Sequence, residues 1–458
     1  MNVNKKWHFI DPEVTCVQTA DGVLTLRQLF IPYFIEQLLM NLMGTVNTLV
    51  LGHYSDEAVA AVGAANQVIS LVFSFYAVVS GGASIVISHR LGEGNRKTAS
   101  DAAFAAIVTC TVLSGSVSAV LAGFSVPLMS LLNLSGNVLQ MAVSYFRICI
   151  STSVLQGIIL VVSAILRSYG RPRPAVAVSV MMNAINAVLN YLVVFRPSCV
   201  PLHGASGIAV SAVISRAVSL VMIIICLAGS RLDLDLPHKK PAALSGISNI
   251  LKIGIPGGLS NLSYNFSQVV STSILGLIGT VAISTKVYIS GIVFYVYVVG
   301  FSMGLSTSIL IGWMTGAGEY DKAFRLNRQV LKLTVLLNVS LSVCVYLFYR
   351  PLIGLFTANA QIIEISRNIL FIDIFVELGR GFNHIENNSL CGAGDVIYPM
   401  TVSVISCWVM SILFSYILGI RLSLGLTGCW IAFMMDELGR GILLFARFRS
   451  KKWIGKKV

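Results

Sequence analysis

Twelve apolar stretches, each of about 20 residues or more, divide this sequence, and that is the length a helix needs to cross the hydrocarbon core of a bilayer. They lie at 25–50, 58–88, 99–125, 138–165, 174–195, 205–229, 249–275, 282–312, 328–349, 362–389, 398–419 and 426–447. Lipid cannot satisfy backbone hydrogen bonds, so such spans form helices. We therefore predict an all-α polytopic membrane protein with twelve transmembrane helices.

The charge pattern orients these helices. Only 11% of the residues are charged, against about 25% in an ordinary soluble domain. The net charge of +13 comes from short basic clusters between spans, as in cytoplasmic loops. We expect a multi-pass protein of the cell membrane with both termini cytoplasmic, and the pattern gives no indication of nucleic-acid binding.

The second half of the chain repeats the first. A shift of 224 residues aligns Pro32 with Pro256, Asn41 with Asn265 and Gly170 with Gly394, and a shift of 221 aligns Arg216 with Glu437. Six spans per half is an even number, so both halves enter the membrane from the same side and form a parallel repeat. The fold prediction is two pseudo-symmetric six-helix bundles.

The repeat also sets the expected domains. They are a cytoplasmic N-terminal segment 1–24, an N-lobe 25–229, a polar linker 230–248, a C-lobe 249–447 and a basic tail 448–458. Pro32 and Pro256 occupy the same place in the two halves, and proline removes a backbone hydrogen bond from a helix. We expect both to act as hinges.

The tenth span carries polar side chains where the chain around it is apolar. Seven of them share a helical stripe of about 140°: Asp373, Glu377, Arg380, Asn383, His384, Asn387 and Asn388. Glu386 lies off the stripe, and the twelfth span adds Asp436, Glu437 and Arg440. A charge at mid-depth costs several kcal/mol unless it is paired or lines a wet cavity.

Two interpretations of these charges stay open. A static salt-bridge network would lock the tenth and twelfth spans together. Alternatively, Glu377 or Asp373 takes up a proton and releases Arg380 to change partners. The seven residues Asp373, Glu377, Arg380, Asp436, Glu437, Arg440 and, in the first span, Glu36 are the candidates for ion coupling.

Glu36 follows Pro32 by one helical turn, and Arg216 of the sixth span is its expected cation. The pair either holds two helices together or makes Glu36 a proton carrier. In the fifth span, Asn183, Asn186 and Asn190 share one stripe and line the cavity or bond across to the first span. Further cavity candidates are Asn47, Asn261, Asn265, Asn383 and Tyr295.

Three segments carry a family resemblance: IPYFIEQLLMNLMGTVNTLVLG in the first span, SIVISHRLGEGN with its echo SILIGWMTGAGE, and LCGAGDVIYP after the tenth span. In this order, and with the repeat, the chain resembles the multidrug and toxic compound extrusion (MATE) family. That family belongs to a wider group that includes lipid-linked oligosaccharide flippases. The resemblance implies two lobes that rock about a central site.

The sequence departs from the usual pattern of this family at two positions. Family members usually carry an aspartate fifteen residues after the first-span proline and another in the fifth span, and here these positions are Asn47 and Asn190. An amide has no proton to exchange near neutral pH. The seventh-span acid of some members would fall near Tyr264 or Asn265. Coupling is therefore expected mainly in the C-lobe.

The leading functional hypothesis is a secondary antiporter that exports organic, cationic or amphipathic compounds in exchange for H⁺ or Na⁺. The alternative is a flippase for lipid-linked oligosaccharide or polysaccharide. The sequence contains no GxxxxGK[ST], HExxH or GxSxG motif, and its six histidines are dispersed. We expect no enzyme activity, no cofactor, no structural metal, and a monomer that binds small organic solutes within the lipid bilayer.

The substitution Asn47→Asp tests whether the first-span amide takes part in coupling. If it does, restoring a carboxylate changes the preference between H⁺ and Na⁺, because a carboxylate can bind either ion and an amide binds both poorly. Transport assayed under separate pH and Na⁺ gradients measures this preference. An unchanged preference would make Asn47 a bystander.

Overall fold

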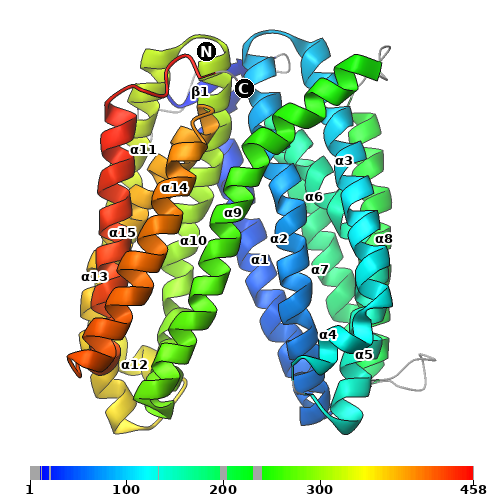
Figure 1. The fold of residues 1–458 in the computed structure, drawn as a ribbon. Coiled ribbons are helices and arrows are strands. Elements are labelled where there is room, and N and C mark those ends of the chain that lie inside the picture. Colours follow the sequence, from blue (N-terminus) through cyan, green and yellow to red (C-terminus); the bar gives the residue numbers. More distant parts are fainter. Residues whose placement is uncertain are drawn as a thin grey trace. The chain divides into compact units, whose positions relative to one another are not determined.

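The computed structural model describes residues 11, 13–19, 22–132, 134–195, 204–230, 240–456 and 458. Within this part of the chain the fold is helical apart from one antiparallel pair of strands near the N-terminus (Figure 1). These strands are β1 (Cys16–Thr19) and β2 (Gly22–Thr25), and Cys16 pairs with Thr25. The sequence analysis did not predict this hairpin.

The helices of the first half coincide with the first six predicted spans. They are α1 (Leu26–Gly52), α2 (Asp56–Gly92), α3 (Arg96–Gly123), α4 (Ser125–Ser130), α5 (Gly136–Ser151), α6 (Ser153–Ser168), α7 (Pro172–Phe195) and α8 (Gly204–Gly229). The fourth predicted span is the pair α5 and α6, which meet at a bend of 46°. The short helix α4 was not predicted.

The second half repeats this order. Its helices are α9 (Lys240–Ile278), α10 (Thr280–Gly316), α11 (Tyr320–Leu347), α12 (Tyr349–Gly354), α13 (Ala360–Gly392), α14 (Ile397–Ser406) and α15 (Gly425–Arg449). Between α14 and α15 lie two π-helical segments, η2 (Cys407–Leu413) and η3 (Ser415–Arg421), which continue the eleventh span. By length and composition alone, seven helices of the described residues can cross a membrane, or eight if the bent pair counts as one.

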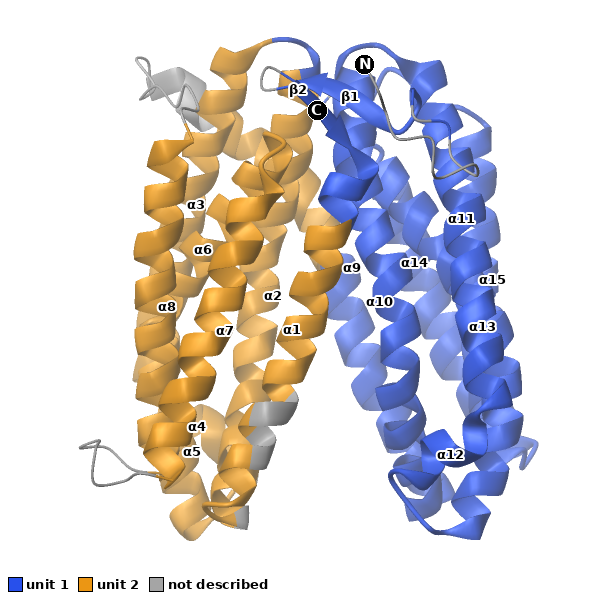
Figure 2. Ribbon diagram, turned by 180° about the vertical axis from the view of Figure 1, so that it is seen from behind, with its two compact units in different colours: residues 1–30, 92–94, 259–458 blue, residues 31–91, 95–258 orange. Residues whose placement is uncertain are grey.

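The chain forms two compact units (Figure 2). One contains residues 31–91 and 95–258, and the other contains residues 1–30, 92–94 and 259–458. The division passes through α1 between Phe30 and Ile31 and through α9 between Gly258 and Leu259, next to Pro32 and Pro256. Of the predicted linker 230–248, residues 231–239 lie outside the described part of the chain.

Glycines let helices of the second unit approach until their backbones touch. A Cβ atom added to Gly379 of α13 would lie 2.7 Å from backbone atoms of Glu437 and Leu438 of α15. One added to Gly441 of α15 would lie 2.8 Å from the Cβ of Phe382. Close approach through small residues is a common way to pack helices in membranes, where burial of apolar surface gives little driving force. This crossing brings the charged faces of α13 and α15 together.

The substitution Gly379→Ala should destabilise the protein by about 1–3 kcal/mol, because the added methyl group forces α13 and α15 apart. Thermal unfolding of the purified protein in detergent measures the effect as a lower Tm. The matched control is Gly439→Ala on α15, since a Cβ at Gly439 meets nothing within 4 Å. Equal Tm values for the two variants would show that the crossing is not tight.

Candidate ion-coupling site

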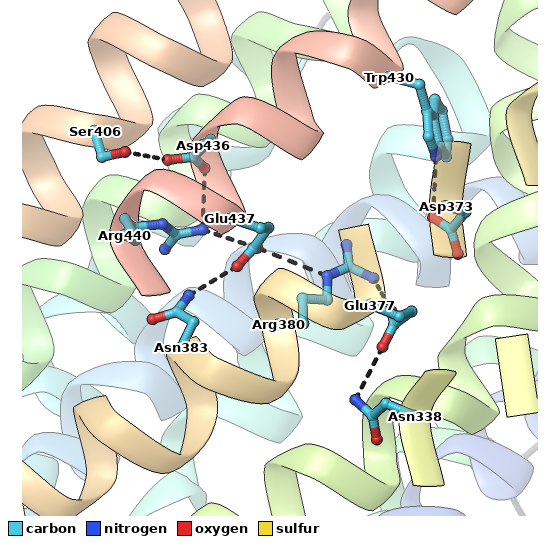
Figure 3. A network of polar contacts seen from close by, with 10 residues as sticks. All are labelled: Asn338, Asp373, Glu377, Arg380, Asn383, Ser406, Trp430, Asp436, Glu437 and Arg440. Atoms are coloured by element: carbon cyan, nitrogen blue, oxygen red, sulfur yellow. Dashed lines mark hydrogen bonds and ion pairs between the residues drawn. The ribbon is translucent and has the colours of Figure 1, made fainter. Parts of the chain in front are cut away.

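Seven polar side chains of α13 and α15 meet where the two helices cross (Figure 3). On α13 the spacing of four, three and three residues places them on one helical face. The α13 residues are Asp373, Glu377, Arg380 and Asn383, and the α15 residues are Asp436, Glu437 and Arg440. The structure thus brings together six of the seven predicted ion-coupling residues, together with Asn383, which was predicted to line the cavity.

Positive and negative groups alternate through this cluster. Arg380 donates through Nη1 to Oε1 of Glu377, and its Nε lies 3.6 Å from Oε1 of Glu437. The Nη2 atom of Arg440 lies 2.8 Å from the same Glu437 oxygen and 3.0 Å from Oδ2 of Asp436. Glu437 therefore joins the two arginines.

Neutral donors complete the cluster. Asn338 of α11 donates to Glu377 at 3.2 Å, and Asn383 donates to Glu437 at 2.8 Å. Ser406 of α14 donates to Asp436 at 2.6 Å, and the indole of Trp430 donates to Asp373 at 3.0 Å. The sequence analysis missed Asn338, Ser406 and Trp430. Asn338 could have been noticed as an amide within an apolar span, whereas Ser and Trp are ordinary in such spans.

The cluster is buried, and its formal charges do not balance. Glu377 is fully buried, and Asp373 is 3% exposed. The cluster contains four carboxyl groups and two guanidinium groups, which leaves a formal charge of −2 if every group is ionised. Within the described residues, Asp373 has no lysine or arginine at ion-pair distance. Each uncompensated buried charge costs several kcal/mol, so the cluster favours uptake of positive charge.

The rest of the α13 stripe lies beside aromatic side chains of α10. The ring of His384 contacts Tyr297 and Phe301 edge-on, with centroids 4.9 Å and 5.8 Å apart. Asn388 donates to the backbone carbonyl of His384 at 2.9 Å, and Asn387 is half-buried. None of these three α13 side chains joins the ion pairs.

Three predicted cavity residues lie apart from the cluster. Tyr295 of α10 is 50% exposed. On α9, Asn261 and Asn265 are both exposed, and Asn265 donates to the backbone carbonyl of Asn261 at 2.9 Å. Their assignment to a cavity stays a prediction.

In the other unit Glu36 pairs with Arg167, so the prediction that Arg216 is its partner is wrong. Arg167, in the last turn of α6, donates to Glu36 at 2.9 Å, and its guanidinium lies 4.7 Å from the centroid of the Tyr33 ring. Arg216 of α8 lies over the ring of Phe73 at 5.2 Å. The predicted fourth span ended at residue 165, so Arg167 fell outside it, and the presence of Arg216 in the sixth span does not decide which way that helix face points.

Three amides of this unit form their own group. The Nδ2 atom of Asn190 donates to Asn47 at 2.8 Å and to Asn186 at 3.1 Å. The Nδ2 atom of Asn183 is buried and has no hydrogen-bond partner among the described residues. The amides carry no charge, and Glu36 and Arg167 compensate each other, so the amide group and the Glu36–Arg167 pair are each neutral.

The described residues contain no group of three or more His, Cys, Asp or Glu side chains that could hold a metal ion. The donors around the carboxylates of α13 and α15 are arginine, amide, hydroxyl and indole groups. The arrangement is suited to holding and exchanging positive charge, and its chemistry is acid–base and electrostatic.

Comparison with known proteins identifies similar chains along almost the whole length. The sequence model of the family described as MatE matches residues 32–192 and 256–417. The chain is 35% identical to the uncharacterized transporter YisQ of Bacillus subtilis (strain 168), over 95% of this chain and 96% of that protein. It is 29% identical to a probable multidrug resistance protein, NorM, of Thermotoga maritima, over 93% and 92% of the two chains.

Solved structures give the same result for the fold. A transporter of the MOP superfamily from Pyrococcus furiosus has a TM-score of 0.85 at 20% identity and covers 94% of this chain and 96% of its own. A MATE transporter in complex with MaD3S also has a TM-score of 0.85 at 20% identity, with coverage of 93% and 96%. These similarities confirm the prediction of twelve helices in two bundles.

A double-mutant cycle tests the partner of Glu36. We expect Glu36→Gln and Arg167→Met to show a coupling energy of about 1–3 kcal/mol, since removing one partner leaves the other buried and unpaired. Thermal or denaturant unfolding in detergent supplies the stabilities. The control cycle combines Glu36→Gln with Arg216→Met and should give additive changes. A coupling energy in the control cycle alone would identify Arg216 as the partner of Glu36.

Proposed function

The chain belongs to the MatE family of multidrug efflux transporters, and on that premise we propose that it is a secondary antiporter that exports organic compounds in exchange for protons. It is a multi-pass membrane protein and not an enzyme. The observation that carries the proposal is the surplus of two negative charges in the buried cluster of α13 and α15. A transporter must bind its coupling ion inside the membrane, and a buried site short of positive charge provides the driving force.

Proton uptake at this cluster changes which groups attract each other. If the Glu377 carboxylate takes up a proton, it keeps the hydrogen bond from Asn338 but loses most of its attraction for Arg380. Arg380 then shifts toward Glu437, whose Oε1 already lies 3.6 Å from its Nε. Each lobe state would thus favour one partner of Arg380, and the pH gradient would drive the alternation between states.

The donors around the cluster favour a proton over Na⁺ as the coupling ion. Amide, indole and hydroxyl hydrogens already point at the carboxylate oxygens, as in the hydrogen bonds from Asn338, Trp430 and Ser406. These donors occupy lone pairs that a sodium ion would need as ligands. A proton needs only one carboxylate oxygen.

Cationic or amphipathic solutes fit the character of this lobe. The cluster is negative overall, and aromatic rings of Phe294, Tyr297 and Phe301 of α10 pack in a row nearby. Aromatic faces attract organic cations. The alternative of a saccharide-lipid flippase receives no support from the relatives described above, one of which, NorM of Thermotoga maritima, is named a probable multidrug resistance protein.

We also propose how the protein sits in the cell. The basic loops and tail support a cytoplasmic location for both termini, with the protein in the cell membrane. Each chain has its own pair of lobes, so one copy suffices for alternating access, and we expect a monomer.

Ethidium efflux from proteoliposomes under separately imposed pH and Na⁺ gradients tests the proposal. We expect the pH gradient to drive efflux and the Na⁺ gradient to add nothing. Efflux driven by Na⁺ alone would overturn proton coupling, and no efflux under either gradient, with ethidium and with other organic cations, would overturn the export proposal.

Glu377→Gln should lower proton-driven efflux to less than about a tenth of the wild-type rate, because glutamine keeps the shape but cannot exchange a proton. The same variant should lose drug resistance in a sensitive host while its level in the membrane stays normal. The matched control is Glu364→Gln, an exposed carboxylate on the same helix. Full resistance in Glu377→Gln would remove Glu377 from the mechanism.

A further inference from the structure

We infer that Glu386 is a second proton-binding group of the C-lobe, through which protons pass between the cluster of α13 and α15 and the C-terminal end of α13. The inference rests on the proposed proton coupling and extends it to a residue on a different face of α13. Glu386 belongs to neither the charged stripe of α13 nor any ion pair of the described chain.

The surroundings of Glu386 are polar on one side only. The side chain is fully buried, and its Oε2 accepts a hydrogen bond of 3.2 Å from Asn327 of α11. The same Asn327 amide donates to Ser389 at 3.0 Å. The Oε1 atom of Glu386 is buried and has no hydrogen-bond partner among the described residues. One carboxyl oxygen is therefore available to carry a proton.

No cation within the described residues compensates Glu386 at ion-pair distance. On α10 the facing stretch 298–316 contains no charged or histidine residue. Beyond the cluster residues of α15, its charged groups are Arg447, which binds Asp395 at 2.8 Å, and Arg449, an exposed residue that interacts with Glu386 only at longer range. On α13 itself the nearest titratable group is His384.

The charged residues of α11 lie mostly at its surface. They are Asp321, Lys322, Arg325, Arg328 and Lys332, of which all but the half-buried Lys322 are exposed. Lys322 pairs with Glu319, and Asp321 pairs with Lys451. In a low-dielectric interior, an unpaired carboxylate costs much more than the neutral acid. A proton is the simplest partner for Glu386.

Helix α11 connects Glu386 to the cluster. Asn338 donates to Glu377 and Asn327 donates to Glu386, both at 3.2 Å, so two amides of one helix contact two glutamates of another. The glutamates are nine residues apart on α13, which is about 13 Å along the axis. That distance is too long for direct proton transfer, so carriers are needed between them.

Buried hydroxyl groups are the available carriers. Thr334 lies on α11 between the two asparagines. Ser302 lies on α10 between Gly300, where an added Cβ would lie 3.0 Å from the Asn338 side chain, and Gly304, where one would lie 2.7 Å from the His384 backbone. Both hydroxyls are buried and have no hydrogen-bond partner among the described residues. A hydroxyl can accept one proton and donate another, which is what a relay requires.

The route ends near the C-terminal end of α13. Glu386 precedes the last residue of α13 by six positions, about 9 Å along the helix. Just beyond lies Asp395 with Arg447 and Lys456 around it. A proton on Glu386 is therefore much closer to the end of α13 than a proton on Glu377.

Infrared difference spectroscopy of the purified protein, between acid and alkaline pH, tests whether Glu386 binds a proton. We expect a carboxylic-acid C=O band in the wild type that Glu386→Gln removes, Glu386→Asp shifts and Glu364→Gln leaves in place. A spectrum of Glu386→Gln identical to that of the wild type would overturn the inference.

Proteoliposomes test the relay itself. Glu386→Gln should slow efflux driven by a pH gradient by at least about tenfold, as for the loss of a proton-transfer group. Ethidium exchange at equal pH on both sides, which needs no net proton movement, should stay near the wild-type rate and shows that the variant is folded. Glu386→Asp should recover part of the gradient-driven rate.

The two proposals fail in different ways. If the wild type shows no proton-driven efflux, the proposed function fails, and the relay fails with it. If the wild type is proton-coupled but Glu386→Gln retains the full gradient-driven rate, only the role of Glu386 is overturned. Equal loss of exchange and of gradient-driven efflux in both Glu386 variants would indicate a structural role and would also overturn the relay.

Discussion

The cost of placing charge in a low-dielectric interior determines the organisation of the C-lobe. Glu437 lies between two guanidinium groups, and Arg380 and Arg440 each contact two carboxylates. Removing any one member would leave a buried group unpaired at a cost of several kcal/mol. The register of α13 against α15 is therefore fixed by electrostatics as well as by packing. The glycines at the crossing are needed because the side chains of α13 and α15 could not reach each other to form ion pairs if the two backbones stood further apart.

The two halves of the repeat compensate their buried charges differently. A shift of 224 residues carries Glu36 onto Ser260 and Arg167 onto Cys391, so the ion pair of the first half has no counterpart in the second. The shift of 221 residues aligns Arg216 with Glu437, which places opposite charges at corresponding positions. Duplication thus preserved the helices while the ionisable groups moved. The first half has a compensated pair, neutral amides and Arg216 over the ring of Phe73, whereas the cluster of the second half has a surplus of negative charge.

The sequence predicted the helices well because lipid permits few alternatives. Each of the twelve apolar stretches became a helix, a helix pair or, for the eleventh, a helix continued by two π-helical segments, since a chain in hydrocarbon must satisfy its own backbone. Helical periodicity placed Asp373, Glu377 and Arg380 on one face, and the cluster follows from that face meeting α15. Features governed by local backbone detail were not predictable, such as the bend between α5 and α6, the π-helical turns of η2 and η3, and the N-terminal hairpin.

Side-chain partners were harder to predict than helices. The pairing of Glu36 with Arg167 required knowing that α6 extends through Arg167 and faces α1, whereas the sequence only gave a basic cluster near a span end. Glu386 was set aside because it left the charged stripe, although a glutamate facing an adjacent helix within the membrane needs a partner of its own. Asn338 and Asn327 could be identified as partners only once α11 was placed against α13.

The contact between Gly379 and the backbone of α15 has a mechanical consequence. Two helices seated backbone to backbone cannot roll or slide past each other without breaking that contact. They must travel as one rigid body whenever the lobe changes shape. When side chains of this pair gain or lose protons, the pair would then move relative to the other helices of the unit. The conformational change of the transporter would begin at the interfaces between the α13–α15 pair and these neighbouring helices.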